Sequence, residues 1–379
     1  MNDICKMKID IHPPYRVVFL DYLRVVAVFM VLLVHACEQF YFGADGGFYI
    51  QSLSDASWVA GIDSACRAAV PLFVMASGYL LLPVRRPTGE FLAHRIFRVG
   101  VPFAIWCCVY NWWNGGSWGQ MLFNFPAATG GHLWFVPMLI GLYLLLPLLS
   151  PWADRASEKE VRGWLILWLF TTTFPFLRKL WGYFYGAPDF GAVPFLYGEC
   201  PWNSFGTFHY VSGFFGYMLL GFYVRKFLPK LDRRQTMSVA LPLLVIGWLI
   251  VSRFFYCRIS NYGTEFPVSA PYAAAVDLEM SWEFCSTGVA MTVAAYFLLL
   301  RRLTGEGAFY RNVVRPLSEA SFGVYLVHIL ILCPVVAALR PHLPTPATIA
   351  ASAAATFVAS SLVCVLGRKI PYAGKLVFG

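Results

Sequence analysis

Apolar runs of about twenty residues, long enough for an α-helix to cross the hydrocarbon core of a bilayer, recur from Val17 to Leu366 with only short polar breaks. The chain is 59% hydrophobic and only 13% charged, so a single water-soluble core could not bury its apolar side chains. The sequence therefore predicts an all-α integral membrane protein. Residues 1–379 are expected to form one membrane domain without a fused soluble domain.

Ten transmembrane helices are expected from hydropathy windows of about nineteen residues. They cover residues 17–37, 58–82, 99–113, 132–150, 164–182, 206–224, 237–256, 282–300, 317–338 and 346–366. The third span is short, so we expect it to be tilted, extended at one end or partly re-entrant.

Basic residues mark one side of the membrane. Most of the 29 Lys and Arg residues fall in the two terminal segments and in every second connection, whereas the other connections hold Arg178, Lys179, Arg258 and Arg340. Because cytoplasmic loops are enriched in Lys and Arg, both termini are predicted to be cytoplasmic and the connection near 183–205 to lie outside. This asymmetry and anionic lipid explain the net charge of +9, so nucleic acid is not an expected partner.

The cysteines give no metal-binding pattern. All ten are scattered, and no C-x-x-C or Cys/His motif occurs, so we expect no metal. Cys200 and Cys257 fall in predicted outer connections, where a disulfide between them is an open alternative.

The first span, which contains DYLRVVAVFMVLLVH, carries ionisable side chains along one face. Arg24 and His35 are eleven residues apart, so they differ by only about 20° around a helix and lie about 16 Å apart along it. Asp21 precedes Arg24 by three residues and can pair with it. Glu38 lies one turn beyond His35 and can orient its imidazole. A polar stripe therefore runs from the inner toward the outer part of this helix.

Contact between this polar stripe and lipid would be energetically unfavourable. Each ionisable group in mid-bilayer costs about 2.5–3.5 kcal/mol on insertion scales, so the stripe is expected to face a cavity filled by water or ligand. The alternative interpretation is a structural ion pair between Asp21 and Arg24, with His35 at the outer interface.

Polar side chains in later spans are candidates for the same cavity. Asp63 and Arg67 lie one turn apart near the outer end of the second span, and Arg253 lies near the end of the seventh. Ser77 lies in a run of small residues that permits close helix packing.

Arg95 and Arg98, at i and i+3 just before the third span, present two guanidinium groups at the predicted cytoplasmic surface. Such forks suit phosphate groups, although positive-inside sorting alone would explain two arginines equally well.

The fourth and ninth spans add aromatic and histidine side chains. His132 and Trp134 open the fourth span from the outer side, where they fit either an interfacial aromatic belt or the rim of a sugar-binding mouth. Ser321, Tyr325 and His328 share one face of the ninth span, either as polar contacts between helices or as part of the cavity.

Five short segments follow one another in a fixed order. They are the Arg24-x10-His35 pattern, the run VPLF…SGY from Val70 to Tyr79, the Arg95-x-x-Arg98 pair, HLWF from His132 to Phe135, and SFGVYLVH from Ser321 to His328. Together they resemble the membrane acyltransferase-3 family over nearly the whole chain. Among its members, the chain resembles the stand-alone ones that O-acetylate sugars of bacterial surface polysaccharides, of the enterobacterial common antigen type.

The resemblance implies an acyltransferase of the bacterial inner membrane. It would take an acyl group, with acetyl expected, from cytoplasmic acyl-CoA and transfer it to a hydroxyl of a surface or lipid-linked glycan. Arg24, His35, Arg95 and Arg98 are the functional residues that it implies. Some members carry an additional span and a fused esterase-like domain, neither of which we expect in this chain. The glycan, a succinyl or other acyl group in place of acetyl, and the oligomeric state stay open.

The chemistry of the residues fits that role. A sugar hydroxyl is a poor nucleophile at neutral pH, and a histidine can overcome this as a general base or as a transient acyl carrier. We expect His35 in one of these roles, and Arg24, oriented by Asp21, at the pantetheine arm or the developing charge. Candidates to stabilise the oxyanion are Arg67, Ser77 and Tyr325.

Two other classes of protein stay open as alternatives. A proton-coupled transporter or flippase would use the side chains of Asp21, His35, Asp63 and Glu283 as a proton relay. Such proteins often have two related halves, and no second copy of the Arg-x10-His pattern occurs. A scaffold of a polysaccharide assembly complex would keep full function after His35→Ala.

Overall fold

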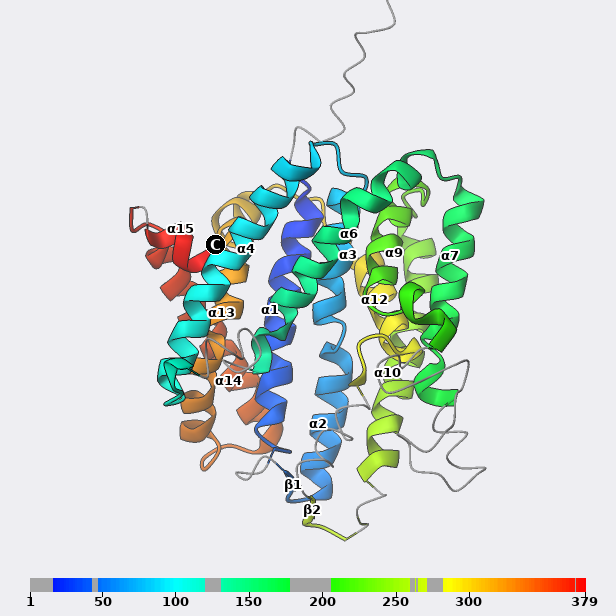
Figure 1. The fold of residues 1–379 in the computed structure, drawn as a ribbon. Helices are drawn as coiled ribbons and strands as arrows, with labels where there is room; N and C mark the ends of the chain where they lie inside the picture. The colour runs from blue at the N-terminus through cyan, green and yellow to red at the C-terminus, as the bar shows by residue number, and fades with distance from the viewer. Residues whose placement is uncertain are drawn as a thin grey trace, which may run out of the picture.

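The structure is a computed structural model that describes residues 16–42, 47–119, 131–177, 206–259, 263, 265–270, 282–371 and 373–379. Its long helices are gathered into one bundle (Figure 1). The helices are α1 (Val18–Glu38), α2 (Leu53–Cys66), α3 (Ala69–Leu81), α4 (Thr88–Trp113), α6 (Phe135–Arg155), α7 (Glu158–Thr171), α9 (Phe215–Lys226), α10 (Arg233–Ile259), α12 (Thr287–Leu300), α13 (Arg315–Leu339), α14 (Thr345–Gly367) and α15 (Ala373–Phe378). The short elements are the turns η1 (Gly131–Trp134), η3 (Gly206–Val211) and η5 (Tyr310–Val314), and the paired antiparallel strands β1 (Phe48–Ile50) and β2 (Val268–Ala270).

Seven helical stretches of the described chain are long and apolar enough to cross a membrane. They are Val18–Glu38, Leu53–Leu81, Thr88–Trp113, Gly131–Arg155, Arg233–Ile259, Tyr310–Leu339 and Thr345–Gly367. The prediction of a helical, multi-pass membrane protein is confirmed at this level. The other three predicted spans overlap in part with the shorter helices α7, α9 and α12. The count of ten crossings and the cytoplasmic placement of both termini therefore stay predictions.

The third predicted span is shorter than the helix that contains it. The sequence places it at 99–113, but α4 begins at Thr88, so Arg95 and Arg98 lie on the helix rather than before it. The extension has a local cause. Glu90 lies in the first turn, where an acidic side chain favours a helix N-terminus, and the first proline inside the helix is Pro102.

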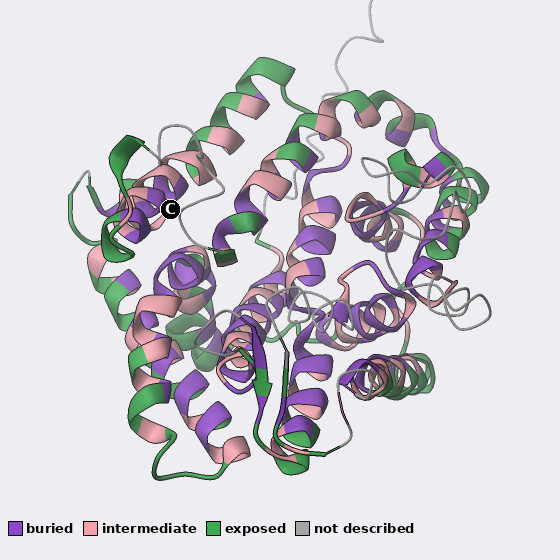
Figure 2. Ribbon diagram, turned by 60° about the horizontal axis from the view of Figure 1, so that its bottom comes forward, coloured by how far each residue is buried: buried purple, intermediate pink, exposed green. Residues whose placement is uncertain are grey.

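Large apolar side chains are exposed along the outer faces of peripheral helices. On α10, Leu241, Val245 and Leu249 recur at four-residue spacing, and on α14 Val358 and Leu362 do the same. Buried residues instead turn toward the interior of the bundle (Figure 2). Exposed apolar stripes at helical spacing are what a surface in contact with lipid requires.

Helices α3 and α9 pack with their backbones in contact. A Cβ atom on Gly78 would lie 1.9 Å from the carbonyl oxygen of Met218, and one on Gly221 would lie 2.0 Å from the carbonyl oxygen of Met75. The run of small residues at the end of α3 therefore allows a helix approach that no larger side chain would permit.

Helix α1 lies inside the bundle, where it packs against α2, α3, α12, α13 and α14 (Figure 1). The pair of short strands lies at the end of the bundle opposite the start of α1. Near that start, α15 packs on α4 and α13, and the indole N–H of Trp106 donates to the carbonyl of Val377 at 2.9 Å. The connection predicted near 183–205, with Cys200 of the open disulfide, lies outside the described residues.

Candidate active site

A cavity of about 470 Å³ lies beside the N-terminal half of α1, where α1, α3, α4, α6 and α13 meet. Its volume falls within the range of about 300–1,000 Å³ that is typical of ligand pockets. The sequence-based candidates that line it are Asp21, Arg24, Ser77, Arg95, Arg98, Ser321 and Tyr325. The fold thus gathers side chains from four helices that are far apart in the sequence.

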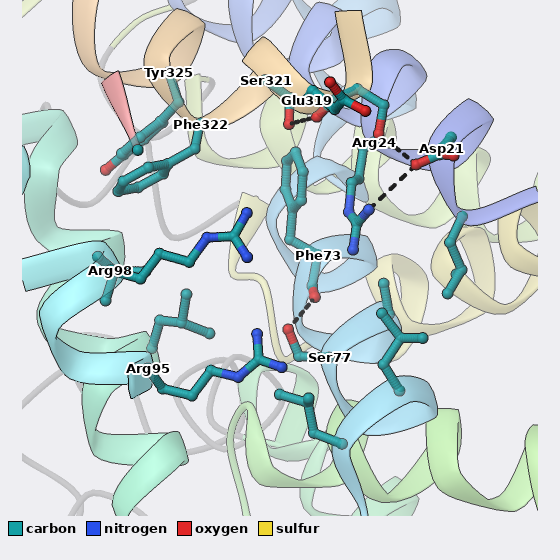
Figure 3. Close-up of a pocket in the computed structure, with 18 of the residues that line it drawn as sticks. Asp21, Arg24, Phe73, Ser77, Arg95, Arg98, Glu319, Ser321, Phe322 and Tyr325 are labelled. Carbon is teal, nitrogen blue, oxygen red and sulfur yellow. Dashed lines mark hydrogen bonds and ion pairs between the residues drawn. The ribbon is translucent and has the colours of Figure 1, made fainter. Parts of the chain in front are cut away.

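Three guanidinium groups give this cavity a positive character. Arg95 and Arg98 extend from α4 toward α1 and α3 and face Arg24 across the hollow (Figure 3). Within the described part of the chain, neither Arg95 nor Arg98 forms an ion pair, whereas Nη1 of Arg24 lies 3.3 Å from Oδ1 of Asp21. Unneutralised arginines in a partly enclosed site attract anionic ligands, and phosphates above all.

Asp21 joins α1 to the segments around it. Its buried carboxylate accepts hydrogen bonds from Nε of Arg16 at 2.5 Å and from the hydroxyls of Tyr310 and Ser318, each at 2.7 Å. The pair with Arg24 predicted by spacing is present, but the shorter ion pair is the one with Arg16. This pair was not predicted, because Arg16 precedes the first span.

Arg16 is held by two carboxylates. Its Nη1 lies 2.5 Å from Oε1 of Glu319 on α13, in addition to its bonds with Asp21. Burial alone would lower the pKa of Arg16, but the hydrogen bonds to Asp21 and Glu319 raise it above the ordinary value of an arginine. Arg16 is therefore a neutralised part of the cavity wall, unlike Arg95 and Arg98.

His35 lies three turns beyond Arg24 on α1 and contacts Glu38. Nδ1 of His35 lies 2.6 Å from Oε2 of Glu38, and their side chains are 15% and 17% exposed. The spacing of three residues predicted this contact. A carboxylate on Nδ1 fixes the orientation of an imidazole and directs Nε2 away from itself, as in hydrolase triads.

Two further histidines lie against His35. His132 comes from η1 and His328 from α13. The ring centroid of His328 is 5.0 Å from that of His35, and the centroid of His132 is 5.2 Å from His328 and 6.2 Å from His35. No group of three or more His, Cys, Asp or Glu side chains within the described ranges is arranged to hold a metal ion.

Tyr325 separates the cavity from these three histidines. It lines the cavity, and its ring centroid lies 6.0 Å from His132 and 6.1 Å from His328. Its hydroxyl donates to the backbone carbonyl of His132 at 2.6 Å. Phe135 adds a second ring, 5.6 Å from Tyr325, and Val31 lines the cavity one turn before His35. The cavity therefore ends one helical turn from His35.

Asp63 and Arg67 lie elsewhere. They form a buried ion pair with two contacts, and Nη2 of Arg67 lies 3.1 Å from Oδ2 of Asp63. The guanidinium also lies 4.8 Å from the ring centroid of Trp282 and 5.7 Å from that of Phe284. Neither residue is among the described side chains that line the cavity. The sequence cannot show that this ion pair lies outside the cavity. The energetic cost of a charge within a span is the same whether the charge faces the cavity or another helix.

The remaining candidates have other surroundings. Arg253 is exposed on α10 and joins neither the cavity nor the histidines. Trp134 is 41% exposed and packs against Phe214 and Phe284. The hydroxyl of Ser77 donates to the carbonyl of Phe73 at 2.9 Å, and that of Ser321 donates to the carbonyl of Ser318 at 2.9 Å.

Several residues of the site had escaped the sequence analysis. Ser318 had a signal, because it precedes Ser321 by three residues on the same helix face. The ring centroid of Tyr110 lies 4.7 Å from that of His132. No sequence signal indicated this contact, because Tyr110 lies on a different helix and its spacing along α4 does not relate it to His132. The others are Arg16, Tyr310 and Glu319.

These features define a multi-pass membrane protein with a cationic cavity one helical turn from a partly buried histidine–carboxylate pair. Residues 17–365 match the acyltransferase domain that defines the acyltransferase-3 family, and the chain belongs to this family. It is therefore a membrane acyltransferase, and the resemblance found in the sequence is confirmed at the level of the family. No curated protein and no solved structure matches the chain.

Proposed function

We propose that this acyltransferase moves an acyl group, acetyl above all, from cytoplasmic acyl-CoA to a hydroxyl of a surface or lipid-linked glycan. It works in the bacterial inner membrane, with both termini in the cytoplasm. The observation that carries the proposal is the cavity itself, which has unneutralised arginines at one end and ends one helical turn from His35 at the other.

The donor is inferred from the charges in the cavity. The diphosphate and the 3′-phosphate of CoA need cationic hydrogen-bond donors, and Arg95 and Arg98 have no carboxylate partner among the described residues. A charge-assisted hydrogen bond contributes about 1.5–3 kcal/mol, so two such arginines are enough to select a phosphorylated donor. Apolar side chains such as Phe73 and Leu139 line the rest of the cavity and suit the pantetheine arm.

Arg24 is assigned to the donor rather than to the oxyanion. It lies about 16 Å along α1 from His35, which is too far to reach a carbonyl that is attacked there. The other oxyanion candidates are also engaged, since Arg67 pairs with Asp63 outside the cavity and the hydroxyls of Ser77 and Tyr325 donate to backbone carbonyls. We therefore place Arg24 on the diphosphate or the pantetheine arm.

Transfer breaks the C–S bond of the thioester and forms a C–O bond to the glycan. As a general base, His35 accepts the hydroxyl proton while the oxygen attacks the carbonyl carbon, and that proton then goes to the departing sulfur of CoA. As an acyl carrier, His35 attacks the thioester carbonyl through its ring nitrogen, the C–S bond breaks and CoA leaves as the thiolate. The glycan oxygen then attacks the acyl carbon, the C–N bond to His35 breaks, and the hydroxyl proton that is released balances the proton taken up by the thiolate. In both routes the carboxylate of Glu38 stabilises the positive charge that forms on the ring.

The test uses isolated membranes that contain the protein and the cells' own glycans. Radiolabelled acetyl-CoA should label the glycan, and the mass added to the glycan in cells with the gene identifies the acyl group. His35→Ala should insert normally, bind acetyl-CoA as wild type does, and lose about a hundredfold or more in the initial rate. A variant at normal level that labels the glycan at the wild-type rate would remove His35 from the mechanism. Glycan translocation without any CoA would favour a flippase instead.

A further inference from the structure

We propose that His132 and His328 form the binding site for the acceptor hydroxyl, on the far side of Tyr325 from the acyl-CoA cavity. The proposal rests on the proposed function and adds to it the place where the glycan hydroxyl is held. The two imidazoles would contact that hydroxyl and orient its oxygen toward the acyl group at His35.

The first observation is an unmet hydrogen-bonding capacity. Nε2 of His132 and Nε2 of His328 are both buried, and neither has a hydrogen-bond partner in the described part of the chain. A buried polar atom without a hydrogen-bond partner destabilises the folded protein. Two such atoms, on rings whose centroids lie 5.2 Å apart, mark a place that is completed by a polar ligand group.

The chemistry of that group follows from His328. Its Nδ1 lies 2.6 Å from the carbonyl oxygen of Tyr325, and a carbonyl can only accept, so Nδ1 carries the proton of the neutral ring. Nε2 of His328 is then a lone-pair acceptor that needs an O–H or N–H donor. A hydroxyl donates one proton and also accepts, so it satisfies His328 and suits either tautomer of His132.

Neighbouring side chains do not supply that donor. The rings of Tyr110 and Tyr325 lie beside His132, but each hydroxyl gives its single proton to a backbone carbonyl. Tyr110 donates to Leu326 at 2.9 Å, and Tyr325 donates to His132 at 2.6 Å. The carboxylate of Glu38 is an acceptor, and it faces Nδ1 of His35. The missing donor therefore comes from outside these side chains.

The surroundings of His132 allow a glycan to approach. Gly131 and Trp134, the first and last residues of η1, are exposed. The rings of Trp134, Phe214 and Phe284 lie 5.3–5.9 Å from one another and form an aromatic cluster whose Trp134 is two residues from His132 in the chain. Aromatic side chains beside a few convergent polar groups are the usual lining of a small-molecule site.

The decisive variant is His328→Asn. The side-chain amide of Asn can take the place of Nδ1 and keep the bond to the carbonyl of Tyr325, while nothing replaces Nε2. The matched control is Ser360→Ala, which removes another buried polar atom without a described partner, on α14. Both variants, with wild type and His35→Ala, are assayed for thermal unfolding, for acetyl-CoA binding, and for the initial rate of glycan labelling in isolated membranes.

We expect His328→Asn to unfold at the wild-type temperature, to bind acetyl-CoA with an unchanged Kd, and to label the glycan at least about tenfold more slowly. Ser360→Ala should label it at the wild-type rate. If His328→Asn fails to insert, the same three assays are made on His132→Asn, for which we expect the same loss of labelling rate.

The outcomes separate this inference from the proposed function. His35→Ala without activity, together with full activity of His328→Asn and His132→Asn, would overturn the hydroxyl site and leave the acyl transfer standing. That result would assign the two nitrogen atoms to bound water. Wild-type membranes that do not use acetyl-CoA at all would instead overturn the proposed function.

Discussion

Nδ1 of His35 lies 2.6 Å from Oε2 of Glu38, one turn further along α1, and both side chains are largely buried. The carboxylate is therefore placed to stabilise a positive charge on the imidazole whichever role His35 has. A neutral partner at position 38 could still accept a hydrogen bond from Nδ1, but it would not offset that charge.

Glu38→Gln is therefore expected to lower the rate of acyl transfer about tenfold or more, or roughly 1.4 kcal/mol in activation free energy, without changing the Kd for acetyl-CoA. Initial rates of glycan labelling and acetyl-CoA binding to the same preparation measure the two effects. An unchanged rate would mean that Glu38 only packs against His35.

Arg95→Ala and Arg98→Ala should each weaken acetyl-CoA binding. The loss of one charge-assisted contact to phosphate corresponds to about 1.5–3 kcal/mol, which is a tenfold or greater rise in Kd. The matched control is Arg155→Ala, because Arg155 is an exposed arginine at the end of α6 that does not line the cavity. Equal, small effects of all three substitutions would reduce Arg95 and Arg98 to topology signals.

Asp21→Ala and Arg24→Ala should separate stability from activity. Without Asp21, Arg16 loses its buried carboxylate partner and the hydroxyls of Tyr310 and Ser318 lose their acceptor, so unfolding should become easier by about 3–5 kcal/mol. Without Arg24, Asp21 keeps Arg16, so stability should change by less than about 1 kcal/mol while acetyl-CoA binding weakens. Thermal unfolding in detergent measures the change in stability, and acetyl-CoA binding measures the change in Kd. Strong destabilisation by Arg24→Ala would contradict the central role of Arg16.

Gly78→Ala should destabilise the contact between α3 and α9. The added Cβ would overlap the carbonyl of Met218, so the two helices must move apart, at a cost of about 1–3 kcal/mol or more. Gly163→Ala on α7 is the control, because nothing lies within 4 Å of its Cβ position and alanine favours a helix. The measurement is the yield and unfolding temperature of each protein. Similar values for both would argue against the close packing of α3 on α9.

The orientation of the chain can be tested with Tyr210→Cys and Lys230→Cys, since both positions are exposed. A membrane-impermeant maleimide should label Tyr210→Cys in intact cells, and should label Lys230→Cys only after permeabilisation. The unsubstituted chain gives the background from its native cysteines. The reverse labelling pattern would place Arg95 and Arg98 on the outer side of the membrane and would contradict a cytoplasmic acyl-CoA donor.

The polar face of α1 could be predicted because helix geometry alone fixes it. The pairs Asp21–Arg24 and His35–Glu38 follow from a spacing of three residues, and the structure contains both. The meeting of His132 and His328 with His35 could not be predicted in this way. It depends on how three separate elements pack, and spacing within one helix carries no information about its neighbours.

The sequence also selected residues that the cavity does not use. Arg67 and Arg253 were candidates because a charge in or near a span is costly. Arg67 is stabilised locally by Asp63 and by the ring of Trp282, and Arg253 is exposed on α10. The cost of a charge shows that a partner is needed, but it does not say whether that partner is a side chain, solvent or a substrate.

The rings of Tyr325 and Phe135 have a consequence for the cell's energy supply. With the cavity open to the cytoplasm and the histidines reached from the other side, as proposed, a continuous aqueous path between them would conduct ions and discharge the membrane potential. In that arrangement the aromatic rings would exclude water from the short interval between the two openings, as hydrophobic constrictions do in closed channels. Tyr325 and Phe135 would therefore also form a barrier to ion leakage between the donor cavity and the acceptor site.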